Sequence, residues 1–84
     1  MIAHYVKIDN SQSSEKMRGI VEAIMGIDEF TEKEIWNRDY REGYTIGYAR
    51  VLEDRGALGD TDLKTLGNEL FHDLMLHFQN FPEN

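Results

Sequence analysis

Apolar residues recur at helical spacing along most of the chain. They lie three and four residues apart over 15–25 and over 32–55, and they form a long leucine- and phenylalanine-rich stripe over 61–80. Residues at this spacing share one face of an α-helix. The pattern predicts a mainly α fold of three helices, at about 15–25, 32–55 and 61–80.

The first residues follow a different pattern. Residues 2–8 alternate, with Ile2, Val6 and Ile8 on one side, and they are rich in β-branched and aromatic residues. This pattern predicts a short β-strand. A strand followed only by helices has no partner in its own chain, and its edge is a template for pairing. We therefore expect a homodimer in which two copies of the strand pair, or else addition of the strand to a sheet of the target.

The ends of the predicted helices carry recognisable residues. Thr31 and Glu34 have the spacing of a capping box, in which each side chain bonds the backbone N–H of the other residue. Gly26 and Gly56 follow the first and second helices, where glycine commonly ends a helix. The third helix is expected to be capped by Asp60 or the next residue. The connection before it is short, so the second and third helices are expected to form an antiparallel hairpin.

One alternative stays open for the middle of the chain. Residues 36–51 also fit a β-hairpin, because Tyr44, Ile46 and Tyr48 alternate after a possible turn. That structure would give an α+β fold. The helix is preferred because the capping box and Gly56 bracket the whole segment.

The second predicted helix has an aromatic face with two small residues in it. At 100° per residue one side collects Trp36, Tyr40, Gly43, Tyr44, Gly47, Tyr48 and Val51. Such a face usually belongs to the core. We expect the two glycines, four residues apart, to admit a large side chain from another helix.

Length and charge narrow the classes of partner. The 84 residues fit a single domain over 1–84, and the net charge is −7. This charge repels nucleic-acid phosphates and anionic lipids, so we expect no direct nucleic-acid or membrane binding and favour another protein, a basic one, as the partner. The chain has no cysteine, no signal-peptide pattern and no membrane-length apolar run. We expect a cytoplasmic protein.

Few residues suggest chemistry. His72 and His77 are five residues apart, which places them about 140° apart around a helix, so they cannot chelate one metal from the same helix. There is no phosphate-binding loop and no serine in a nucleophile elbow. The sequence predicts neither an enzyme nor a cofactor.

A resemblance adds a biological context. The run from Tyr40 to Gly56, YREGYTIGYARVLEDRG, followed by a leucine-rich helix, resembles the helical hairpins of small uncharacterised accessory proteins of bacteriophages and prophages. The similarity covers about 32–80. It implies an accessory, host-modulating protein and assigns no functional residue.

The predicted function is therefore a small acidic interaction module, a regulator or inhibitor that docks on a larger protein. Its candidate surface combines aromatic, apolar and acidic residues: Tyr5, Ile46, Tyr48, Leu76, Asp60, Asp62, Glu69 and Asp73. Two alternatives are a helix-turn-helix transcriptional regulator, which the lack of a basic helix face disfavours, and a structural homo-oligomer with no separate ligand.

Overall fold

The structure is a computed structural model that describes residues 13–80. Within these residues the chain forms four helices and no strand, in the order α1 (Ser14–Met25), α2 (Glu32–Trp36), α3 (Arg38–Asp54) and α4 (Leu63–Asn80). The mainly α prediction is confirmed. The predicted strand at 2–8 lies outside the described residues.

The helix α1 begins and ends through local hydrogen bonds. The hydroxyl of Ser13 accepts from the Lys16 amide at 3.1 Å, which satisfies one of the free N–H groups of the first turn. At the other end Gly26 takes a left-handed conformation with φ of 79°. The Ile27 amide then reaches back to the Glu22 carbonyl at 3.0 Å. The predicted stop at Gly26 is confirmed.

The predicted single helix over 32–55 is wrong, because the chain breaks at Asn37. The capping box at its start is present, with both the Thr31 and the Glu34 hydrogen bonds formed. However, Asn37 is extended, with ψ of 110°, and its side chain accepts from the Tyr40 amide at 2.9 Å. Asparagine is among the best N-cap residues, so it ends the short α2 and starts α3.

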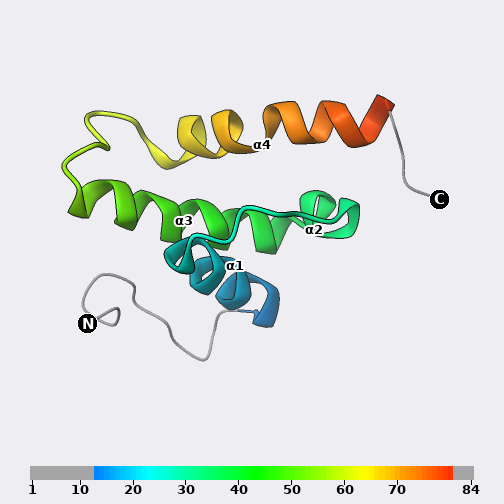
Figure 1. Cartoon of the computed structure of the whole chain (residues 1–84), viewed down its shortest axis with the longest axis horizontal. Coiled ribbons are helices and arrows are strands. Elements are labelled where there is room, and N and C mark those ends of the chain that lie inside the picture. The colour runs from blue at the N-terminus through cyan, green and yellow to red at the C-terminus, as the bar shows by residue number, and fades with distance from the viewer. Residues whose placement is uncertain (1–12, 81–84) are drawn as a thin grey trace.

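The helical hairpin of α3 and α4 is confirmed. Figure 1 shows the two helices side by side and antiparallel, joined by the loop after α3. Gly56 ends α3 with φ of 68°, and the Ala57 amide bonds the Leu52 carbonyl at 2.8 Å, as in a Schellman motif. Because 38–54 is helical, the alternative β-hairpin at 36–51 is wrong. The helix α4 begins two residues later than predicted, and its cap is Asp62, which accepts from the Thr65 amide at 2.7 Å.

The helix α1 crosses α3 at backbone contact. A Cβ atom added to Gly43 would lie 1.9 Å from the Lys16 carbonyl oxygen, and one added to Gly47 would lie 2.5 Å from that of Ile20. The contact is mutual, since a Cβ at Gly19 would lie 2.3 Å from a backbone oxygen of α3. The expectation that the two glycines admit a large side chain is wrong. They admit the backbone of another helix.

The core lies where α3 is covered by the other helices. Tyr40 and Tyr44 are buried, as the aromatic face predicted, and Tyr44 contacts Phe30 and Phe71 edge to face with centroids 5.0 Å and 5.7 Å away. Trp36 is the exception, with 47% of its surface exposed. The break at Asn37 changes the phase of the helix and takes Trp36 off the buried face.

Candidate functional site

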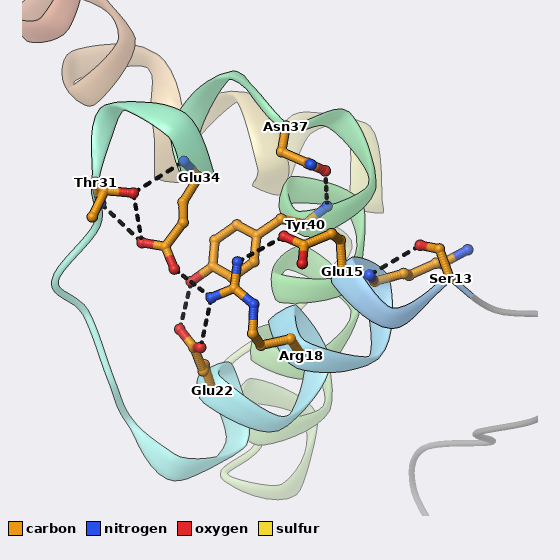
Figure 2. A network of polar contacts seen from close by, with 9 residues as sticks. Ser13, Glu15, Arg18, Glu22, Thr31, Glu34, Asn37 and Tyr40 are labelled. Atoms are coloured by element: carbon orange, nitrogen blue, oxygen red, sulfur yellow. Dashed lines mark hydrogen bonds and ion pairs between the residues drawn. The ribbon is translucent and has the colours of Figure 1, made fainter.

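A polar network joins α1 to α2 around one guanidinium (Figure 2). Arg18 contacts Glu15 at 2.7 Å and Glu22 at 2.9 Å on its own helix, and it forms a third ion pair with Glu34 of α2. Hydrogen bonds from Arg18 to Glu15 and Glu34 raise its pKa above the ordinary value. Burial works to raise the pKa of Glu34, but the Thr31 amide and Arg18 together lower it. Both shifts favour the charged forms of Arg18 and Glu34 at neutral pH.

The network also reaches α3 through Tyr40. The Tyr40 hydroxyl donates to Glu22 at 2.8 Å, and the Arg18 guanidinium carbon lies 4.6 Å from the centroid of its ring. Burial and the neighbouring Glu22 carboxylate raise the pKa of this phenol. The pKa values of Arg18, Glu34 and Tyr40 are all shifted away from neutral pH, and each of these groups already has partners. The network is therefore suited to positioning three helices rather than to proton transfer.

A groove of about 750 Å³ runs between α3 and α4. Phe71 and Thr45, both buried, belong to its lining, and Ile46 and Met75 are half-buried beside them. Leu63 also lines the groove and keeps 50% of its surface exposed. The groove is therefore largely apolar and open to solvent.

Basic side chains gather around this groove although the chain is acidic. Arg38, Arg41 and Lys64 line it, and among the lining residues that the structure describes Glu42 is the only acidic one. Arg38 pairs with Glu42 at 3.1 Å, and Arg41 donates to the Ile35 carbonyl. Within the part of the chain that the structure describes, no carboxylate forms an ion pair with Arg41 or Lys64. The groove has a local positive charge on a chain of net charge −7.

The structure separates the residues that the sequence proposed as one interaction surface. Ile46 lines the groove. Tyr48 is half-buried and stacks on Tyr44, with ring centroids 6.4 Å apart, so it belongs to the edge of the core. Tyr5 lies outside the described residues. Among the described residues, Ile46 and Tyr48 do not share a face with the acidic candidates.

The acidic candidates lie on and before α4. Glu69, Asp73 and Leu76 are exposed and follow helical spacing, so they share the outer face of α4. Asp60 is exposed in the preceding loop. Asp62 is exposed too, but the Thr65 amide that it caps lowers its pKa, which indicates a structural role.

The cations of the groove were missed by the sequence analysis. Arg38, Arg41 and Thr45 recur at helical spacing on α3, and Lys64 and Phe71 do so on α4. This periodicity could have located two lining faces. The net charge of the whole chain concealed it, because acids elsewhere outnumber these bases.

Two structural absences apply to residues 13–80. No group of three or more histidine, aspartate or glutamate side chains is placed to hold a metal ion there. No helix in the same range has both the length and the apolar composition needed to cross a membrane.

The chain was also compared with known proteins. No protein-family model, curated protein or solved structure matches it.

Proposed function

We propose that the protein is a small interaction module whose α3–α4 groove receives a segment of a partner protein. The observation that carries the proposal is the groove itself, with an apolar floor, an exposed leucine and a cationic rim. Apolar depressions bordered by polar groups are typical of protein-binding surfaces. A regulator or inhibitor that docks on a larger protein uses such a surface, and a role in a phage or prophage agrees with the resemblance of the hairpin.

The outer face of α4 offers a second contact to the same partner. The carboxylates of Glu69 and Asp73 are exposed there, on the helix whose other face forms one wall of the groove. Basic groups of the partner would meet these carboxylates while another of its segments occupies the groove. Rim charges of this kind mainly set association rate and specificity.

Affinity capture with paired variants tests the proposal. Three forms of the protein are immobilised on a resin and incubated with a lysate of the organism that encodes the chain. They are the wild type, a groove variant with Leu63→Asn and Lys64→Glu, and a control variant with Leu76→Asn and Lys33→Glu. The two variants change the charge equally, and all four positions are exposed. We expect the same proteins on the wild type and the control, and their loss from the groove variant. Equal capture by both variants would exclude the groove as the binding site.

Self-association through α1 is a second candidate, favoured by a separate observation. Val21 and Met25 are one turn apart on α1 and are 43% and 67% exposed, and Ile27 after the helix is 39% exposed. Clustered apolar side chains of this kind favour a homodimer. Light scattering at micromolar concentration is expected to give a dimer for the wild type and a monomer for Val21→Ser with Met25→Ser. A dimer in that variant would place the interface elsewhere.

A further inference from the structure

We infer that the α3–α4 groove binds an acidic amphipathic helix, with apolar side chains on the groove floor and carboxylates at its cationic rim. This inference rests on the proposed function, because it names the chemistry of the segment that the groove receives. The length of the groove, its apolar positions and its charge each support it.

The length of the groove suits two to three turns of helix. Its lining runs from Arg38 to Ile46 on α3 and from Leu63 to Met75 on α4. At 1.5 Å per residue these stretches are about 12 Å and about 18 Å long. A helix that docks through anchors at i, i+3 or i+4, and i+7 needs about 10.5 Å. Two antiparallel helices also present the kind of ridged surface against which a third helix packs.

The apolar lining provides places for such anchors. Phe71 is 2% exposed, and half-buried Ile46 and Met75 line the groove with it. Leu63 is half exposed and would lose its remaining contact with water under a docked helix. Methionine adapts its shape to irregular partners, so the groove tolerates a range of apolar anchors.

The charge of the groove favours carboxylates on the ligand. Within residues 13–80 the lining holds three basic residues, Arg38, Arg41 and Lys64, and one acidic residue, Glu42. The net charge of −7 opposes an acidic ligand at long range. However, exposed charges farther away than about 8 Å are largely screened at physiological salt, whereas groups in contact are screened much less. The rim cations therefore decide the sign of the interaction once the helix is docked.

Two synthetic peptides of equal length test the inference. Both carry leucines at i, i+3, i+7 and their continuations. One has glutamates and the other lysines at the flanking positions. Fluorescence anisotropy at physiological salt is expected to give at least about tenfold tighter binding of the glutamate peptide by the full chain. That difference corresponds to about 1.4 kcal/mol.

Four single variants locate the binding. Leu63→Asn is expected to weaken binding of the glutamate peptide by about three- to tenfold, and Leu76→Asn by less than about twofold. Lys64→Glu is expected to weaken it by about fivefold or more, because an attractive contact becomes a repulsive one, whereas Lys33→Glu has little effect at the same net charge. Circular dichroism checks that each variant is folded. Equal effects within either pair would overturn the inference.

The remaining outcomes separate this inference from the proposed function. Tighter binding of the lysine peptide overturns the acidic helix, while groove-dependent capture from the lysate leaves the interaction module standing. A third outcome is that neither peptide binds but decanoate does, and that Leu63→Asn and Lys64→Glu abolish decanoate binding. This result overturns the acidic helix in favour of a small anionic amphiphile as the ligand. If neither peptide binds and capture is also independent of the groove, both proposals fall.

Discussion

We expect Gly43→Ala to destabilise the protein, although alanine is the better helix former. In an open helix the substitution stabilises by about 1 kcal/mol. Here the new Cβ would lie 1.9 Å from the Lys16 carbonyl oxygen, against 3.4 Å or more for ordinary contact. The backbone of α1 would have to move by about 1.5 Å, and a helix moves as a unit, so the whole crossing would loosen.

Overpacking of a close-packed interface costs about 1–3 kcal/mol and occasionally more. Because the obstacle at Gly43 is backbone and cannot rotate away, we expect a net loss of about 2–3 kcal/mol after the gain in helix propensity. A domain of this size has a total stability of about 4–12 kcal/mol. The midpoint of thermal unfolding should therefore fall by roughly 10–20 °C.

Gly67→Ala is the matched control on α4. Its Cβ would meet the Thr45 hydroxyl at 3.1 Å, a side-chain atom that can shift by a few tenths of an ångström. We expect a change within about 0.5 kcal/mol, because the small clash and the gain in propensity offset each other. Circular dichroism melts of both variants provide the measurement. Equal midpoints for Gly43→Ala and the wild type would mean that α1 does not rest on α3 at this position.

Three other outcomes are expected. Thr31→Ala should lower the free energy of unfolding by about 1 kcal/mol in urea titrations, because it removes the capping box of α2; an unchanged midpoint would show that the cap contributes nothing. The pKa of Glu34 is lower in the folded protein than its ordinary value of 4.5. The contribution of Glu34 to the free energy of unfolding is therefore fully present above pH 4.5 and is lost as the pH falls through the pKa of the folded state. Acid titration of Glu34→Gln should thus show a shallower loss below pH 4.5 than the wild type, and identical curves would contradict the linkage. Duplex DNA should not bind at about 150 mM salt, given the net charge of −7, and a saturable mobility shift would restore the helix-turn-helix alternative.

Three helix ends were predictable because they depend on near neighbours. The capping box at Thr31 and Glu34 and the left-handed stops at Gly26 and Gly56 each involve hydrogen bonds between residues a few positions apart. Such motifs carry their partners with them in the sequence. Their positions could therefore be predicted without knowledge of the tertiary structure, and the structure confirms them.

The break at Asn37 was missed for a physical reason. The helical spacing of apolar residues continues across Asn37. Such spacing does not reveal a break in which a single non-helical residue separates two helices. The side chain of Asn37 competes with the backbone for the Tyr40 amide, and this competition is the reason that asparagine favours caps over helix interiors.

The partner of the glycine face was also missed. Gly43 and Gly47 did mark a helix contact, but their counterpart is the similarly spaced pair of Gly19 and Ala23 on α1, both buried. Small residues at matching spacing on two helices indicate that the two backbones touch. Small residues on one helix alone do not show whether a side chain or a backbone packs against them. The groove between α3 and α4 required the structure, since its two walls come from helices whose register no local pattern specifies.

The backbone crossing of α1 and α3 has an entropic consequence. Where Gly19 meets α3, the touching atoms belong to the main chain, so the contact freezes no side-chain rotamers beyond those that helix formation already requires. A long side chain ordered on burial loses up to about 1.5–2 kcal/mol of rotamer freedom, and this crossing avoids that cost at its centre. The α3–α4 groove is lined by rotatable side chains such as Met75 and Leu63 instead. The molecule thus has one side whose shape is set by the main chain and another that can change shape by changing rotamers.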